Sequence, residues 1–414
     1  MTAIHRAFLL VMLCLWGLSA CRRAPEIFSA HPTDTLTLTV RSKTPSSETF
    51  PAKPTPVYPT PKFPTCQPDP APAFNPGAYS FMPIRPVSNR EGDAPSLRQL
   101  AELRRFYVGV STAPQFLDDP GYAELLAGQF NMLAAENAMK WEVVHPKPER
   151  YDFSQGDALV AFARANGMAV YGHALVWDLQ QPDWLTRGEY SREEWIQILC
   201  RHIKTVVSHY RGYIYAWDVV NEAFQNNGAL RDTLWLRKIG PEYIAMAFQW
   251  AREADPQTLL IYNEFFAEGL NQKSQAVYSL VQGMLQQGIP IDGVGLQMHV
   301  WLWGPPTRHE LLANMRRLAE LGLLAHITEM DVRTQYSRDS QAEELTVQAE
   351  VYRQAFSACL EAPNCNVFVA WGLTDRYSWI PEHTGQPDAP LLFDRQGKPK
   401  PAFNALLDML RRSP

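Results

Sequence analysis

Two glutamates end apolar runs of the kind that form buried strands. Glu222 ends the run Trp217-Asp-Val-Val-Asn-Glu, and Glu329 ends the run Ala325-His-Ile-Thr-Glu. Burial and neighbouring charges shift the pKa of such a carboxyl group, so it can act as an acid, a base or a nucleophile. Two carboxyl groups that face each other across a cleft can hydrolyse a glycosidic bond, because one protonates the leaving oxygen while the other attacks the anomeric carbon or activates water.

Other apolar runs in the sequence also end in polar or aromatic side chains. A single buried glutamate is most simply explained as a structural residue in an ion pair. Seven strand ends that together present carboxylates, amides, imidazoles and indoles favour a functional site instead. These ends carry, in chain order, Glu136, Asn137 and Lys140; His173, Trp177 and Asp178; Asn221 and Glu222; Asn263 and Glu264; Gln297 and His299; Glu329 and Asp331; and Trp371, Asp375, Ser378 and Trp379.

The elements that must position these residues alternate between short β-rich runs and amphipathic stretches. Eight such strand–helix units predict an α/β fold, a parallel sheet closed into a (β/α)8 TIM barrel that spans residues 95–414. The chemistry of such barrels lies at the C-terminal ends of the strands, and the fourth and seventh strands lie nearly opposite each other, so Glu222 and Glu329 should meet across the mouth. The expected strands are 106–111, 132–136, 169–176, 216–221, 259–263, 293–298, 325–329 and 367–372, and the clearest helices are 193–210, 242–253, 274–287, 310–321 and 342–360.

Composition narrows the class of substrate. The chain has 414 residues and a net charge of −5 at pH 7. It shows no basic patch, which argues against nucleic acid as a partner and favours a neutral or weakly charged substrate. Most of the 12 Trp residues should lie in the core, but some should stack on sugar rings, because flat aromatic faces suit the apolar faces of pyranoses. No spacing of Cys and His resembles a zinc site, and we expect neither a metal nor another cofactor.

The N-terminus is typical of a targeting segment. His5 and Arg6 precede a short apolar run over residues 7–18, which is too short to span a bilayer as a helix. The sequence Leu18-Ser-Ala-Cys21 resembles a bacterial lipobox, so we expect residues 1–20 to be a lipoprotein signal peptide and Cys21 to be lipidated. The alternative is an ordinary signal peptide with a chance cysteine. Both interpretations predict an exported protein, and the lipobox predicts one that is anchored to a membrane at the bacterial cell surface or in the envelope.

Residues 21–94 are rich in Pro, Ser and Thr and show neither helical nor strand periodicity. This composition predicts a disordered, extended tether that holds the barrel away from the membrane. Cysteines are free to pair in an exported protein, and Cys359 and Cys365 are close enough in sequence to close a short loop. Cys66 lies among prolines and Cys200 in a helical pattern, and the sequence alone assigns neither a partner.

The strand-end motifs, taken together and in order, resemble those of the glycoside hydrolase family 10 xylanases. The resemblance runs from about residue 97 to the C-terminus and includes Pro390-Leu-Leu-Phe-Asp394 and Lys400-Pro-Ala-Phe. It implies an endo-acting enzyme that hydrolyses β-1,4-xylosidic bonds with retention of configuration. It also makes Glu222 the general acid/base and Glu329 the nucleophile, and it matches Cys359 and Cys365 to a disulfide.

The resemblance implies supporting roles for further residues. His299 donates to Glu329, Asp331 orients His299, and Asn221 binds the sugar 2-hydroxyl. The substrate-binding set comprises Glu136, Asn137, Lys140, His173, Gln180 and Gln297, with Trp177, Trp371 and Trp379 as stacking walls.

The sequence departs from the family's pattern at a few positions. Asp178 stands where His is usual, and we expect it to pair with a basic side chain or to raise the pKa of a neighbouring acid. Phe265 and Phe266 replace the usual Tyr-Asn on the leaving-group side, and Ile380 replaces an Arg after Trp379. These differences concern fine specificity and leave both glutamates in place.

Two alternative functions stay open at this point. A related β-1,4-glycanase would act on glucan or mixed substrates if the pocket beside Gln180 and Trp379 admits a hydroxymethyl group. A non-catalytic sugar-binding surface protein would keep the barrel without turnover, although the presence of both glutamates argues against it. We expect the protein to act on xylan or xylo-oligosaccharides as a monomer.

Overall fold

The computed structural model describes residues 61–79, 81, 95–337 and 339–412. The predicted signal peptide, Cys21 and most of the predicted tether lie outside these residues. The described residues belong to one compact unit.

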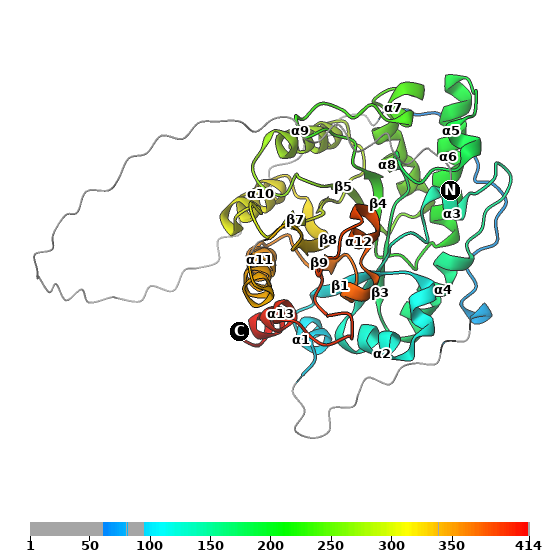
Figure 1. Ribbon diagram of the computed structural model, residues 1–414. Helices are drawn as coiled ribbons and strands as arrows, with labels where there is room; N and C mark the ends of the chain where they lie inside the picture. The colour runs from blue at the N-terminus through cyan, green and yellow to red at the C-terminus, as the bar shows by residue number, and fades with distance from the viewer. Residues whose placement is uncertain (1–60, 80, 82–94, 338, 413–414) are drawn as a thin grey trace, which may run out of the picture. The chain divides into compact units, whose positions relative to one another are not determined.

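The unit is a closed parallel barrel surrounded by helices (Figure 1). Eight strands run in the order β1-β2-β3-β4-β5-β6-β8-β9, and β1 pairs with β9 to close the ring. The short strand β7 extends the edge of β8. The predicted (β/α)8 barrel is therefore confirmed. The strands are β1 Tyr107–Thr112, β2 Met132–Ala135, β3 Ala169–Gly172, β4 Ala216–Asn221, β5 Leu259–Glu264, β6 Gly293–Leu296, β7 His299–Trp301, β8 Leu324–Arg333 and β9 Val367–Ala370.

The helices begin at side chains that satisfy their first backbone amides. Ser191, Thr307 and Ser340 each form a capping box with the glutamate three residues later, which fixes where α6, α10 and α11 begin. The α-helices are α1 Leu97–Leu103, α2 Pro120–Gln129, α3 Trp141–Val144, α4 Ser154–Ala165, α5 Asp183–Thr186, α6 Arg192–His209, α7 Leu234–Lys238, α8 Tyr243–Ala254, α9 Gln272–Gln286, α10 Arg308–Glu320, α11 Gln341–Glu361, α12 Trp379–Thr384 and α13 Pro401–Arg412.

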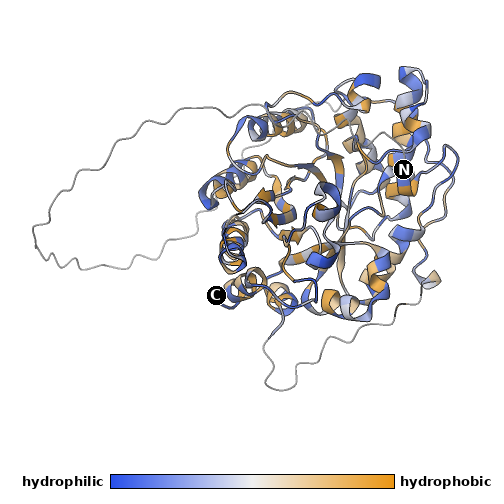
Figure 2. Cartoon of the chain, in the orientation of Figure 1, coloured by the Kyte–Doolittle hydropathy of each residue, from blue (hydrophilic) through white to orange (hydrophobic). Residues whose placement is uncertain are grey.

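Two apolar layers hold the barrel together. Inside the ring, residues such as Met132, Tyr171 and Ile261 fill the space between the strands. Outside it, the helices bury one face against the strands: in α6, Trp195, Leu199 and other residues at helical spacing are fully buried. The hydropathy colouring follows this arrangement: the strands are mostly hydrophobic, and the helices are amphipathic (Figure 2). Among the described helices, none is long and apolar enough to cross a membrane.

The sixth expected strand is interrupted. β6 ends at Leu296, and β7 begins at His299 after two residues that do not continue the sheet. Met298 lies between them with a φ of 64°, in the left-handed region that extended strands exclude. The chain therefore bends at the mouth of the barrel between Gln297, which follows β6, and His299, which begins β7.

Part of the predicted tether, residues 61–79, lies among the described residues and is docked on the barrel. Residues 61–79, which we call the N-terminal strap, pack against α6 and α8. Cys66 forms a disulfide with Cys200 of α6, and the indole of Trp250 in α8 donates to the Pro64 carbonyl at 2.9 Å. Phe74 is buried, and its amide donates to the carbonyl of His209. The prolines keep this segment extended without internal ladders, so its carbonyls are free to bind helix side chains.

The second disulfide joins Cys359 to Cys365, as predicted. It closes the turn between α11 and β9, with a Cα–Cα distance of 5.1 Å. The pairing of Cys66 with Cys200 was not foreseen, because the two residues are 134 positions apart.

The two disulfides should stabilise the barrel unequally. Cross-linking limits the unfolded chain more when the closed loop is longer, so loops of 134 and 6 residues correspond to about 5 and about 2 kcal/mol in the chain-entropy model. Replacing Cys66 and Cys200 by Ala should lower the free energy of unfolding, measured by guanidinium denaturation of the oxidised protein, more than replacing Cys359 and Cys365. An equal or smaller loss for the long-range pair would contradict the idea that the strap is covalently stapled in the native protein.

Candidate active site

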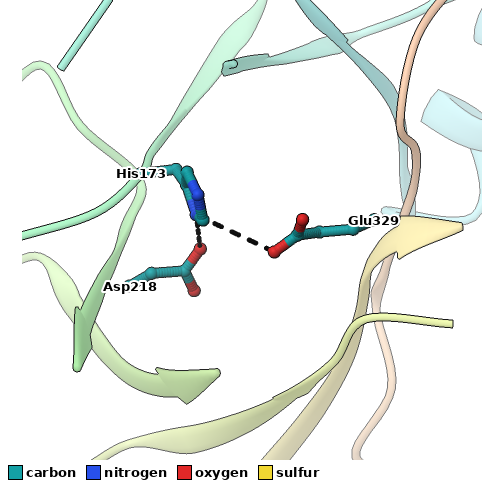
Figure 3. Close-up of side chains that lie close together, drawn as sticks. All are labelled: His173, Asp218 and Glu329. Atoms are coloured by element: carbon teal, nitrogen blue, oxygen red, sulfur yellow. Dashed lines mark hydrogen bonds and ion pairs between the residues drawn. The ribbon is translucent and has the colours of Figure 1, made fainter. Parts of the chain in front are cut away.

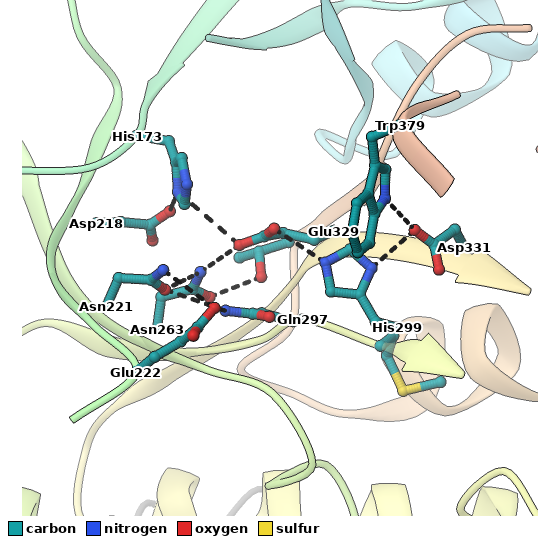
Figure 4. Close-up of polar contacts among 12 residues, drawn as sticks. His173, Asp218, Asn221, Glu222, Asn263, Gln297, His299, Glu329, Asp331 and Trp379 are labelled. Atoms are coloured by element: carbon teal, nitrogen blue, oxygen red, sulfur yellow. Dashed lines mark hydrogen bonds and ion pairs between the residues drawn. The ribbon is translucent and has the colours of Figure 1, made fainter. Parts of the chain in front are cut away.

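Glu222 and Glu329 lie at the mouth of the barrel and reach toward one polar network (Figure 4). Glu222 follows β4 directly, and Glu329 lies within β8. Glu222 adopts a φ of 59°, which is uncommon for a residue with a side chain and is typical of functional sites that the surrounding structure holds in place.

Glu329 is a buried carboxylate with donors on both oxygens. Its Oε1 accepts from the Asn263 amide, and its Oε2 lies 3.2 Å from His299 Nε2. Nδ1 of His173 lies 3.8 Å from Oε1. Burial alone would raise the pKa of Glu329, but the charge interaction with His173 and the hydrogen bonds from His299 and Asn263 outweigh burial and hold the pKa below its ordinary value. Glu329 is therefore ionised when the site is empty.

His299 is the cation that supports this ionisation. Burial would lower its pKa, but the charge of Asp331 and hydrogen bonds to Asp331 and Glu329 raise it to about 10. The β7–β8 register places His299 beside Asp331, and Nδ1 lies 2.7 Å from Asp331 Oδ2. The Trp379 indole donates to the same oxygen at 3.0 Å.

Glu222 has a neutral polar surrounding instead. Its Oε1 accepts from the Gln297 amide at 3.2 Å and from the Asn221 amide at 3.4 Å. Asn221 Oδ1 accepts in turn from Asn263 and Gln297, each at 3.0 Å. The Asn221 carbonyl is thereby occupied, which leaves its amide directed toward Glu222 and the mouth.

His173, Asp218 and Glu329 offer ligand atoms that all lie within 4.8 Å of one another (Figure 3). Nδ1 of His173 is 2.8 Å from Asp218 Oδ2 and also faces Glu329. A proton on this nitrogen would lie between the two carboxylates, at the place that a metal ion would need. Burial raises the pKa of Asp218 to about 6, against the effect of His173. The cluster is thus explained as part of the Glu329 environment.

Lys140 contacts side chains from the segments that follow β2 and β3. Its ammonium donates to Asn137 Oδ1 at 2.8 Å and to Gln180 Oε1 at 2.6 Å, and it lies 4.7 Å from the centre of the Trp177 ring. Burial lowers the pKa of Lys140. The predicted binding residues Asn137, Lys140, Trp177 and Gln180 therefore do lie together. Glu136 lies beside Asn137, and burial raises its pKa to about 7.

Two tryptophans border the carboxylates. The Trp371 ring is edge-on to His173 and His299, at centroid distances of 5.1 and 6.3 Å. The Trp379 ring is edge-on to His299 at 5.4 Å. Trp371 is buried, and Trp379 is half-buried at the entrance.

Of the two alternatives expected for Asp178, the ion pair with a basic side chain is wrong, whereas a contribution to the raised pKa of a neighbouring acid is found at Tyr243. Among the described residues it forms no ion pair, and its Oδ1 accepts from the backbone amide of Leu234 at 2.6 Å. Leu234 is the first residue of α7, so Asp178 satisfies a free amide where a helix dipole favours negative charge. It adds to the raised pKa of Tyr243, which is due first to burial.

The other departures have separate explanations. Ile380 is fully buried and fills the core under α12. The Phe265 ring lies 3.4 Å from the Lys273 ammonium, whereas Phe266 is exposed and has a φ of 55°.

Asn263 and Asp218 act on the site but were missing from the predicted set. Asn263 accepts from the Thr328 hydroxyl at 2.8 Å, which orients its amide toward Glu329. The signal for Asn263 was its position at the end of β5, next to an equally polar Glu264. Asp218 could have been recognised as a charged residue inside an apolar strand, where burial requires a partner.

An ionised carboxylate and a second carboxyl group at one barrel mouth define a site that can hydrolyse glycosidic bonds. Comparison with known proteins agrees with this class. A model of glycosyl hydrolase family 10 matches residues 96–409, and the chain belongs to this family.

Individual relatives cover nearly the whole barrel. Endo-1,4-beta-xylanase B of Thermotoga neapolitana is 43% identical over 317 residues, which cover 76% of this chain and 91% of that protein. The crystal structure of native xylanase 10B from Thermotoga maritima aligns with a TM-score of 0.74 at 43% identity, covering 77% of this chain and 98% of that one. Xylanase 10B from Thermotoga petrophila, solved in complex with xylobiose, aligns with a TM-score of 0.75 at 42% identity, covering 77% of this chain and 98% of that one.

Gly295 in β6 provides a test of the network behind Glu329. A Cβ at this position would lie 2.2 Å from Asn263 Oδ1 and 2.9 Å from the Thr328 methyl group. Gly295→Ala should displace the Asn263 amide and lower kcat/KM for glycoside hydrolysis about ten-fold or more, since small misplacements at a site are costly. Gly283→Ala in α9, where a Cβ meets nothing within 4 Å, is the matched control and should keep full activity. Full activity in both variants would show that the Asn263 position is unimportant.

Proposed function

We propose that this protein is an endo-acting β-1,4-xylanase that hydrolyses xylan with retention, with Glu329 as nucleophile and Glu222 as general acid/base. The observation that carries the proposal is the unequal surrounding of the two carboxyl groups. Glu329 is held ionised by cationic and amide donors, whereas the Glu222 carboxyl group accepts hydrogen bonds from the neutral amides of Gln297 and Asn221. Membership of the family and the names of its relatives favour xylan as the substrate.

In the first step, Glu329 attacks the anomeric carbon of the xylose unit at the mouth. Glu222 gives its proton to the glycosidic oxygen, and the aglycone leaves. As the covalent bond forms, negative charge leaves Glu329, so the His299–Asp331 pair no longer faces a carboxylate. The Asn221 amide is placed to bind the sugar 2-hydroxyl, a contact that strengthens in the transition state.

In the second step, Glu222 acts as the base. Glu222 is a carboxylate after the first step, and it takes a proton from water. The water attacks the anomeric carbon, and Glu329 leaves as a carboxylate. Two inversions give overall retention.

The residues around Lys140 form the glycone side in this proposal. Asn137, Lys140 and Gln180 present amide and ammonium donors in a preformed network, and Trp177 supplies a flat face. Glu136 and His173 complete the set. Trp379 and Gln180 decide whether a hydroxymethyl group fits, which distinguishes xylan from glucan.

We further propose that the enzyme is exported and anchored through lipidated Cys21, with residues 1–20 as the signal peptide, and that it acts as a monomer. The two disulfides support export, because such bonds persist in oxidising compartments and are rare in reducing ones. The anchor can be tested by growing cells that express the wild type or Cys21→Ala with a radioactive fatty acid. The wild-type protein should become labelled and the Cys21→Ala protein should not.

The substrate and the two roles can be tested together. Wild type should release xylo-oligosaccharides from xylohexaose and act much more slowly on cellohexaose. With a dinitrophenyl β-xylobioside, whose leaving group needs no acid, Glu222→Ala should stall at the covalent intermediate, and azide should release the β-azide. In Glu329→Ala, azide should replace the missing nucleophile and give the α-azide.

If Glu222→Ala gave the α-azide and Glu329→Ala gave the β-azide, Glu222 would be the nucleophile and Glu329 the general acid/base. Faster cleavage of cellohexaose would favour the glucanase alternative. A folded wild type without any hydrolysis would favour the non-catalytic binding protein.

The His299 cation predicts a pH effect. Replacing His299 by Gln removes its charge, and it also leaves the Asp331 carboxylate unneutralised nearby. Both changes raise the pKa of Glu329, so the acid limb of the kcat/KM profile, where the free nucleophile gains a proton, should move to higher pH by about one unit. His383→Gln, which alters an exposed histidine next to Trp379, is the control and should leave the limb in place. An acid limb that stays or moves to lower pH in His299→Gln would contradict this account of Glu329.

A further inference from the structure

Strand β8 continues past the catalytic centre to Arg333. The β7–β8 register pairs His299 with Asp331 and, two residues later, Trp301 with Arg333. Because side chains alternate along a strand, Arg333 projects to the same side as Asp331. With a rise of about 3.3 Å per residue, it lies roughly 13 Å farther along the strand than Glu329.

The Arg333 guanidinium is held by aromatic rings. It lies 5.2 Å from the centre of the Trp301 ring and 5.0 Å from that of Trp379. Trp379 is the residue that donates to Asp331, so Arg333 adjoins the catalytic centre directly. Cation–π contacts of this kind fix a charge while using none of its N–H donors.

Arg333 lacks an anionic partner within the described part of the chain. It forms no ion pair there, and its Nε is buried without a hydrogen-bond acceptor. Two carboxylates on neighbouring segments each use one oxygen elsewhere: Asp331 Oδ2 accepts from Trp379 and contacts His299, and Asp388 Oδ1 accepts from Thr334. Their other oxygens, Asp331 Oδ1 and Asp388 Oδ2, are buried without a hydrogen-bond partner, and neither carboxylate forms an ion pair with Arg333 among the described residues. The Arg333 guanidinium therefore keeps its charge at this edge of the site without a carboxylate partner among the described residues.

An exposed aromatic platform adjoins this cation. We use this name for Trp301, Trp303 and Tyr336. The Trp301 ring stacks on Trp303 at 5.3 Å and lies 5.9 Å from Tyr336. Trp303 and Tyr336 are 50% and 71% exposed. Flat aromatic faces left open beside a polysaccharide site suit the apolar face of a further sugar.

We propose that Arg333 binds the carboxylate of a uronic-acid branch on the xylan chain, while the aromatic platform packs against the branch sugar. The proposal rests on the proposed xylanase function and extends it to a substrate class. The planar guanidinium matches a carboxylate with two parallel hydrogen bonds, which a neutral branch such as a pentose cannot offer. A fixed cation also offsets the net charge of −5, which would otherwise repel an acidic polymer.

The test compares two xylo-oligosaccharides of equal length, one unbranched and one carrying a single uronic-acid branch. Arg333→Gln should lower kcat/KM on the acidic substrate about ten-fold and change kcat/KM on the unbranched one less than two-fold. Arg333→Lys should recover part of the difference, and added salt should reduce it in the wild type. Arg211→Gln, an exposed arginine in the turn before β4, is the matched control and should change neither value.

Equal losses on both substrates would overturn the proposal, because Arg333 would then act only through Asp331 and Trp379. An unchanged value on the acidic substrate would overturn it as well. Titration calorimetry with the acidic oligosaccharide separates this result from a failure of the xylanase function. This binding measurement uses Glu329→Ala and does not depend on turnover. Adding Arg333→Gln to Glu329→Ala should weaken binding of the acidic oligosaccharide but not of the unbranched one. If both variants bound the acidic oligosaccharide equally well, the proposal would again be overturned.

Discussion

The site depends on keeping one buried carboxylate, that of Glu329, in its charged form. Glu329 is almost fully buried, and burial alone favours its protonated form. Asn263 and the two histidines reverse that preference, and each of them is fixed by a further partner: Asp331 for His299, Asp218 for His173 and Thr328 for Asn263. The charge is therefore stabilised by groups that do not have to move when the reaction begins.

The barrel supplies this arrangement because the partners of Glu329 come from several strands. His173 follows β3, Asp218 lies in β4, Asn263 in β5, His299 begins β7, and Glu329 and Asp331 lie in β8. Parallel strands bring their C-terminal ends to one rim, so residues far apart in sequence become neighbours without long loops. This arrangement strains the backbone at the rim, where Glu222 and Met298 both adopt left-handed conformations.

Much of this could be predicted from the sequence, because strand periodicity and strand-end polarity are local signals. The ring of strands and the location of both glutamates at its mouth followed from such signals. Asp178 shows where they fail: its acceptor role for the Leu234 amide depends on where α7 begins in space. The break at Met298 and the partner of Cys66 depend on contacts between distant segments, which periodicity does not encode. The N-terminal strap was missed for a related reason, since a proline-rich composition is equally compatible with a free chain and with one docked on helices.

The strap also determines how mechanical load enters the enzyme. A pull transmitted to the strap reaches the barrel at Pro64, whose carbonyl accepts from Trp250 of α8, and then at the Cys66–Cys200 bond and the neighbouring contacts of α6. That bond is covalent, and α6 is an outer helix whose inner face is fully packed, so the force is spread along the helix as shear. Glu222 and Glu329 lie at the ends of other elements, β4 and β8, so a load on the strap passes through outer helices before it reaches the strands that carry them.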